Sequence, residues 1–129
     1  MNVYSFDYNS EYFPSAPTVE VEIFAPETPE NTLTLTALVD SGSDGTIIPL
    51  KILKQIGAEV IDTLTVRGIH NIGVVTSTYR TSLRIGEFTI NRVAVVSSTQ
   101  TNEILLGRDV LNHFIVTLNG LAGVTEISQ

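Results

Sequence analysis

Residues 37–46 have the sequence ALVDSGSDGT, in which an apolar segment runs directly into Ser, Asp and Gly residues. This pattern is typical of a buried strand that ends in a tight turn. The strand would carry the carboxylate of Asp40 out of the core, Ser41 could form a hydrogen bond beside it, and Gly42 would let backbone approach closely. The alternative is an ordinary Asx turn, because an Asp-Ser/Thr-Gly triplet occurs by chance in about one chain in twenty of this length.

The segments before this stretch predict two strands. Residues 18–24 alternate between apolar and acidic side chains, as in a half-exposed strand, whereas residues 33–39 end wholly apolar and should enter the core. The acidic, proline-containing stretch 25–32 predicts a surface loop between them. Residues 3–8 place three aromatic side chains on one side of an extended segment, which predicts either an outlying strand or a loosely attached arm.

The segments after the stretch predict a short helix followed by hairpins. Pro49 suits the first turn of a helix that Gly57 would close. Residues 60–96 are dominated by Val, Ile and Thr and predict antiparallel hairpins, and a closing hairpin is expected over 115–127 with its turn at Asn119-Gly120. The turn or bulge positions expected within 60–96 are Gly68, Gly73 and Gly86.

A second informative segment, residues 104–112, has the sequence ILLGRDVLN. Its apolar triplet predicts a brief buried strand, and the residues from Arg108 to His113 predict a short helix with its apolar side chains on one face. No internal repeat, linker or low-complexity tract is present. We therefore expect one domain over residues 18–129, preceded by an arm or outlying strand over residues 1–17.

Together, the two segments resemble the signatures of retroviral-type (retropepsin-like) aspartic peptidases. That family has an apolar strand, Asp-Thr/Ser-Gly, a small residue and Asp, and Ser43 and Asp44 fill the last two positions here. Its second signature is an apolar triplet, Gly, Arg or a similar polar residue, and a short helix. The resemblance extends over about residues 19–118. It implies a mostly β, closed, antiparallel, barrel-like retropepsin fold with one or two short helices, and aspartic endopeptidase activity.

The resemblance also implies a homodimer. The mechanism needs one ionised carboxylate to draw a proton from water and one protonated carboxyl to polarise the peptide carbonyl. Like charges about 3 Å apart share a proton, as is established for aspartic proteases in general. This chain encodes one such loop, so the second Asp40 would come from a two-fold partner. The partners implied are a second copy and a peptide or protein substrate, with no cofactor.

Individual residues gain expected roles from the same resemblance. Arg108 would pair with Asp44 and brace the loop, supported by Gly107. Asp109 has an expected role that does not depend on the resemblance: an acidic residue at the start of a helix is favourable, so Asp109 would ease the start of its helix rather than take part in catalysis. Residues 97–102 fall where the family keeps a substrate-lining loop. The catalytic residues would be Asp40, Ser41 and Gly42, and the substrate-binding residues would be Asp44, Gly68, Ile69 and His70, the last three on a flap hairpin.

Composition argues against several other classes of protein. The chain is 43% hydrophobic and 16% charged, which is typical of a globular domain. Its 14 Asp+Glu against 7 Lys+Arg, without a basic cluster, argue against binding to nucleic acid or anionic membranes. It has no cysteine, and its two histidines are far apart, so no metal site is expected. Without a signal peptide or a long apolar run, a cytoplasmic protein is expected.

Two other functions remain open from the sequence alone. A peptide-binding or dimerisation module could keep this fold without cleaving peptides, and His70-Asn71 stands where the family flap has glycines. A plain acidic β domain with an accidental triplet would leave residues 104–112 unexplained. The intact triplet at Asp40 favours the peptidase. For the aromatic stripe of residues 3–8, packing onto an apolar patch is favoured over a self-inhibitory arm.

Overall fold

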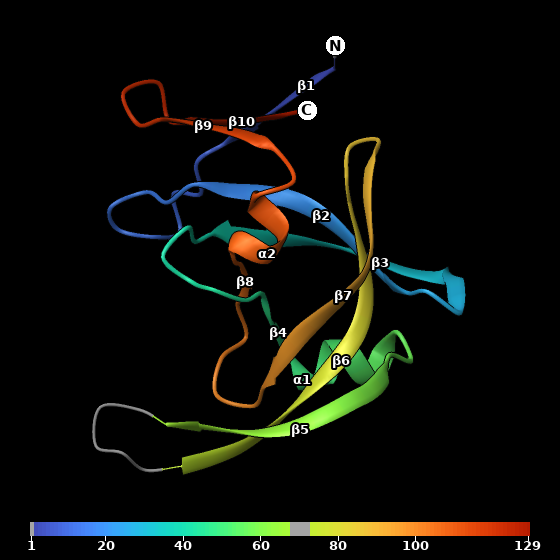
Figure 1. Cartoon of the computed structure of the whole chain (residues 1–129). Helices are drawn as coiled ribbons and strands as arrows, with labels where there is room; N and C mark the ends of the chain where they lie inside the picture. The colour runs from blue at the N-terminus through green and yellow to red at the C-terminus, as the bar shows by residue number, and fades with distance from the viewer. Residues whose placement is uncertain (1, 68–72) are drawn as a thin grey trace.

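The computed structural model describes residues 2–67 and 73–129, and within them the chain is mostly β, as predicted (Figure 1). No helix among these residues is both long enough and apolar enough to cross a membrane. The helices are α1 (Leu50–Gln55) and α2 (Arg108–Leu111). The strands are β1 (Val3–Asp7), β2 (Thr18–Ala25), β3 (Thr28–Val39), β4 (Ile47–Pro49), β5 (Glu59–Arg67), β6 (Gly73–Ile85), β7 (Phe88–Ser98), β8 (Ile104–Leu106), β9 (Ile115–Asn119) and β10 (Val124–Ser128).

The larger sheet bends back on itself. Its strand order is β2-β3-β8-β4-β7-β6-β5, and β2 also pairs with β6, so six of the strands form a ring with β5 outside it. Most pairings are antiparallel, but β3 pairs with β8 and β4 with β7 in parallel. The predicted closed, mostly antiparallel architecture is therefore confirmed, with two parallel pairings that hairpin patterns alone did not predict.

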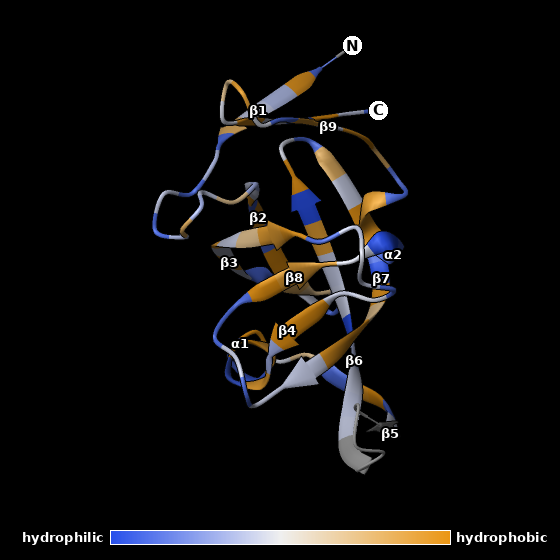
Figure 2. Cartoon of the chain, turned by 90° about the vertical axis from the view of Figure 1, so that its left-hand side faces the viewer, coloured by the Kyte–Doolittle hydropathy of each residue, from blue (hydrophilic) through white to orange (hydrophobic). Residues whose placement is uncertain are grey.

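The core fills the ring and includes residues from the strands that border residues 40–46 and 107–112. The central strands β4 and β8 are largely hydrophobic (Figure 2). Ile48 of β4 and Leu106 of β8 are fully buried, as are Leu53 of α1 and Val110 of α2. Because each of these side chains contributes about 1.5 to 3 kcal/mol by leaving water, β4, β8 and both helices are firmly anchored in the core.

The prediction of a surface loop over residues 25–32 is wrong. Strand β3 begins at Thr28, and Pro26 and Glu27 alone connect it to β2. Ala25 pairs with Thr28, and a bulge after Ile23 shifts the register. Backbone N–H and C=O groups can pair with β2 whatever the polarity of the side chains, so an exposed, polar end of a hairpin can be a strand in spite of its composition.

The terminal strands form a separate small sheet of order β1-β10-β9, with the two chain ends close together (Figure 1). Residues 3–7 are therefore an outlying strand that pairs with β10, and not a loose arm. The Tyr4 ring meets the Phe88 ring edge-on at 5.4 Å, and Phe6 packs against the core. Packing of the aromatic stripe is confirmed for these two side chains, whereas the proposed division of the chain after residue 17 stays a prediction.

Candidate active site

The loop after β3 holds the Asp40 side chain in a fixed turn. The Asp40 backbone N–H donates to the Leu106 carbonyl at 3.0 Å, and the Ser43 N–H donates to the Asp40 carbonyl at 3.1 Å. The Gly42 N–H donates to Asp40 Oδ1 at 3.1 Å. The side chain is half-buried, and within the described residues its second oxygen, Oδ2, accepts no hydrogen bond. One carboxylate oxygen is thus positioned by backbone, and the other is left for a further partner.

Two glycines, Gly107 and Gly42, lie at positions where a side chain would crowd the loop of residues 40–46. A Cβ atom on Gly107 would lie 2.5 Å from both the carbonyl carbon and the carbonyl oxygen of Gly45, which is closer than atoms can approach. The glycine of the second segment is therefore needed for close approach and not for an unusual backbone angle. A Cβ atom on Gly42 would lie 3.3 Å from Asp40 Oδ1, so Gly42 also gives the carboxylate room.

A buried polar cluster locks this crossing. The Thr46 hydroxyl donates to Asp109 Oδ1 at 2.7 Å, and the Thr46 N–H donates to Asp109 Oδ2 at 3.1 Å. The same hydroxyl accepts a hydrogen bond from the Gly107 N–H at 3.1 Å. Thr46 is fully buried, so each of these partners satisfies a group that would be costly to leave unpaired. Asp109 does lie in the first turn of α2, but its carboxylate also holds Thr46 at the end of the loop of residues 40–46, a role that the sequence did not suggest.

Arg108 grips the same loop from the outside. Its Nη2 lies 2.6 Å from Asp44 Oδ1, its Nη1 donates to the Ser41 carbonyl at 2.8 Å, and its backbone N–H donates to the Ser43 carbonyl at 2.9 Å. The expected ion pair is present, although the guanidinium divides its donors between a carboxylate and a carbonyl. The Asp44 side chain is 95% exposed and that of Arg108 45% exposed, so water screens the attraction.

Replacing Arg108 with Ala should therefore lower the free energy of unfolding by less than about 1 kcal/mol. The larger effect should be on cleavage, because Ser41 and Asp44 would lose the side chain that holds them. Arg108→Lys is the matched control, since it keeps the charge but cannot contact both groups as a planar fork. Urea denaturation and peptide cleavage would be measured for both variants. A loss of stability well above 2 kcal/mol would show that this exposed pair is a structural support after all.

The parts of the expected site lie on one side of the molecule. The loop over residues 40–46, the loop between β7 and β8, and the described ends of β5 and β6 all lie at the left in Figure 1. The structure brings Asp40, Ser41, Gly42, Asp44, Gly107 and Arg108 together. Gly68, Ile69 and His70 lie outside the described residues. Within residues 2–67 and 73–129, no group of three or more His, Cys, Asp and Glu side chains could hold a metal ion.

Comparison with known families identifies the group to which this architecture belongs. Residues 30–113, more than half of the chain, match the model of the family described as "gag-polyprotein putative aspartyl protease". The chain belongs to this family. The matched residues of this gag-polyprotein aspartyl protease family member include both crossing segments and the β5–β6 hairpin. A search of curated proteins found no match.

Solved structures show that this family member has a retropepsin-like fold. A retropepsin-like aspartic protease from Rickettsia conorii is 12% identical, with a TM-score of 0.62 over 98% of this chain and 91% of that chain. The EIAV protease in complex with the inhibitor HBY-793 is 20% identical, with a TM-score of 0.59 over 84% of this chain and 93% of that chain. The Simian Foamy Virus (mac) protease is 23% identical, with a TM-score of 0.54 over 74% of this chain and 91% of that chain. At these identities the likeness extends to the fold alone.

Proposed function

We propose that the chain is an aspartic endopeptidase that hydrolyses peptide bonds with a water molecule activated between the two Asp40 carboxylates of a homodimer. The observation that carries the proposal is the placement of Asp40. Its carboxylate is half-buried, is oriented by the Gly42 N–H and has one oxygen without a partner among the described residues. A carboxylate held in this way, in a member of an aspartyl protease family, is suited to proton transfer.

In the proposed reaction, each of the two carboxyl groups has its own part. The ionised Asp40 accepts a proton from water as the water oxygen forms a bond to the peptide carbonyl carbon. The protonated Asp40 of the other subunit donates to the carbonyl oxygen, giving a tetrahedral intermediate. One carboxyl of the pair then donates its proton to the departing nitrogen while the other takes a proton from a hydroxyl of the intermediate. The C–N bond breaks, an amine and a carboxylic acid leave, and the pair again holds one proton. Arg108 and the Thr46–Asp109 cluster would position the loop without contacting the reacting atoms.

The small sheet supplies a surface that fits the proposed dimer. Val3 of β1 and Ile115 and Leu118 of β9 are large apolar side chains that are about half exposed, and Leu121 in the β9–β10 turn is fully exposed. Both outer strands of this sheet, β1 and β9, have an unpaired edge within the described residues. Exposed apolar side chains next to open edges are typical of surfaces that bind another chain. A second copy docked there would explain both features.

The proposal is tested by incubating the purified chain with a broad peptide library between acid and neutral pH. New termini are then identified by mass spectrometry. Cleavage within peptides, and not trimming from their ends, is the expected result. If nothing is cleaved at any pH while sedimentation shows a dimer that binds peptides, the chain is a non-catalytic binding module with this fold.

A further inference from the structure

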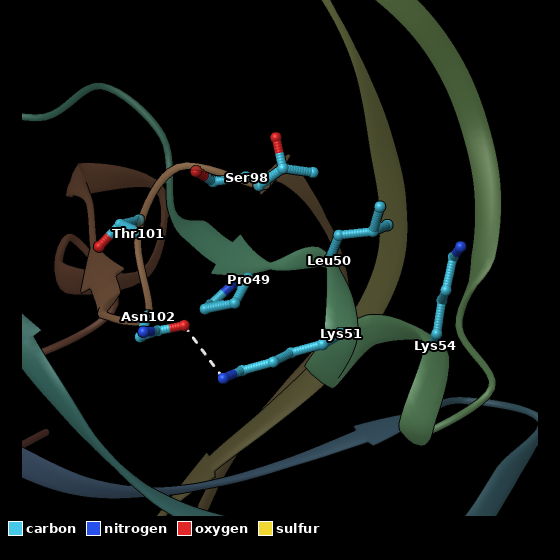
Figure 3. A pocket seen from close by; sticks show the side chains of 8 residues that line it. Pro49, Leu50, Lys51, Lys54, Ser98, Thr101 and Asn102 are labelled. Atoms are coloured by element: carbon cyan, nitrogen blue, oxygen red, sulfur yellow. Dashed lines mark hydrogen bonds between the residues drawn. The ribbon is translucent and has the colours of Figure 1, made fainter.

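A pocket of about 320 Å³ lies between α1 and the loop that joins β7 to β8 (Figure 3). Its lining combines an apolar base with polar and cationic side chains. The residues that line it are Pro49, Leu50, Lys51, Lys54, Ser98, Thr99, Thr101 and Asn102. The volume is at the lower end for ligand pockets, so it suits one or two side chains of a larger ligand better than a whole cofactor.

The charges around this pocket differ from those on the rest of the described surface. Every arginine whose side chain is described has a carboxylate within 4 Å: Arg80 with Glu59, Arg84 with Glu22, Arg92 with Glu27 and Arg108 with Asp44. The chain has two lysines, and both line the pocket. Neither has a carboxylate partner among the described residues, and Lys51 Nζ donates instead to the neutral Asn102 Oδ1 at 3.0 Å. In a chain of net charge -7, the two unneutralised ammonium groups are therefore concentrated at one pocket.

The polar side chains that line the pocket also have hydrogen-bond donors available for a ligand. Lys51 and Lys54 are three residues apart in α1 and therefore lie on one side of the helix. Ser98 Oγ and Thr101 Oγ1 each accept a hydrogen bond from a backbone N–H two residues further on, at 3.1 and 3.0 Å. Within the described residues neither hydroxyl donates to an acceptor, so both O–H groups remain available. The set of donors is suited to a carboxylate, which accepts hydrogen bonds only.

The carboxylate closest in sequence to this loop is already engaged. Glu103 Oε1 accepts a hydrogen bond from the Tyr12 hydroxyl at 2.6 Å. That bond raises the pKa of Tyr12 to about 12, so the Tyr12 hydroxyl keeps the proton that it donates to Glu103 well above neutral pH. Glu103 does not line the pocket, so it does not neutralise the lysines. No other carboxylate among the described residues pairs with them.

The pocket adjoins the proposed active site along the chain. Pro49 ends the strand that continues directly from the loop of residues 40–46, and Asn102 precedes β8, whose end accepts the Asp40 N–H. Ile47 of β4 pairs with Leu105 of β8, so the two walls of the pocket are tied together beside the catalytic loop. An extended peptide that crosses the active-site face could therefore reach the pocket with a side chain outside the cleaved bond.

We infer that this pocket binds a Glu or Asp side chain of the peptide substrate, and that Lys51 and Lys54 make the enzyme prefer acidic substrates. The carboxylate would take the place of Asn102 as the partner of Lys51, and the stem of the side chain would lie on Leu50 and Pro49. This inference rests on the proposed function, because it assigns the pocket to the substrate of the same active site.

The test compares cleavage of matched peptides that carry Glu or Gln at one position. The library screen described above first shows at which position, outside the residues that flank the cleaved bond, Glu and Asp are enriched. The ratio of kcat/KM for the Glu peptide to that for the Gln peptide should fall about fivefold in Lys51→Gln/Lys54→Gln. Lys51→Arg/Lys54→Arg should keep the ratio. Thr89→Glu/Asn91→Asp, at exposed positions at the other end of β7, lowers the net charge equally and should also keep it.

A binding measurement separates failure of this inference from failure of the proposed function. Fluorescence anisotropy would measure the affinity of the Asp40→Asn variant for a labelled Glu-rich peptide and for its Gln counterpart. This measurement does not depend on cleavage. One outcome is that wild-type protein cleaves no peptide, whereas the Asp40→Asn variant binds the Glu peptide more tightly than the Gln peptide and this preference depends on Lys51 and Lys54. In that case the pocket assignment stands and the peptidase proposal fails. If the preference for Glu is absent, or is unchanged by Lys51→Gln/Lys54→Gln, the pocket assignment is overturned whether or not peptides are cleaved.

Discussion

Replacing Asp40 with Asn is expected to lower peptide cleavage by at least about a thousandfold while leaving the fold and the dimer intact. Asn has the shape of Asp and can still accept the hydrogen bond from the Gly42 N–H, so the turn after β3 should persist. It can neither accept a proton from water nor hold one for the peptide carbonyl. Cleavage would be measured on a peptide found in the library screen, and association by sedimentation.

A matched control for this variant is Asp62→Asn. Asp62 is an exposed residue of β5 whose carboxylate accepts a hydrogen bond from the Thr63 N–H, as Asn can. It carries the same change of charge and should leave cleavage unchanged. Cleavage by Asp40→Asn at a rate near that of wild-type protein would mean that another group activates the water.

Replacing Gly107 with Ala is expected to lower the free energy of unfolding by about 3 kcal/mol, near the upper end for overpacked sites. The new Cβ atom would meet the backbone of Gly45 at 2.5 Å, and backbone cannot rotate away as a flexible side chain can. Relief of the clash would separate the crossing segments and disturb the hydrogen bonds of Thr46, so activity should fall as well. Thermal and urea denaturation would measure the loss.

Gly45→Ala is the matched control on the other side of the same crossing. Its Cβ atom would have Asp109 Oδ2 as nearest neighbour at 3.9 Å, an ordinary contact, so the cost should be below about 1 kcal/mol. Equal losses in the two variants would show that general sensitivity of the loop, and not the close approach at Gly107, sets the stability.

Local features near Asp40 were predictable because they depend on neighbouring residues. The run from an apolar strand into Asp-Ser-Gly predicts the end of β3 and the turn, and ILLGRDVLN predicts β8 and α2. Pro49 and Gly57 mark the two ends of α1, with Gly57 at a φ of 75°. The ion pair of Asp44 with Arg108 followed from the resemblance, which places the two segments together.

Features that depend on long-range geometry were not predictable from the sequence. Thr46 and Asp109 are 63 residues apart, and nothing in either neighbourhood indicates that they meet. The one available signal was a hydroxyl residue directly after Gly45 in a turn that should enter the core. The parallel pairing of β4 with β7 likewise depends on the closure of the sheet, and a three-residue strand that ends in a proline has no periodicity of its own. The lysine pocket, too, is formed by segments about 50 residues apart.

The most direct test of the account is the activity of mixed dimers, because its central claim is that two chains each contribute one Asp40. Wild-type and Asp40→Asn chains would be mixed at a constant total concentration at which dimers form, allowed to exchange, and assayed for cleavage. If both carboxylates are needed, activity follows the square of the wild-type fraction, so an equal mixture retains about one quarter of the activity. Activity that falls in proportion to the wild-type fraction, to about one half, would contradict the claim, because each chain would then act with its own Asp40 alone.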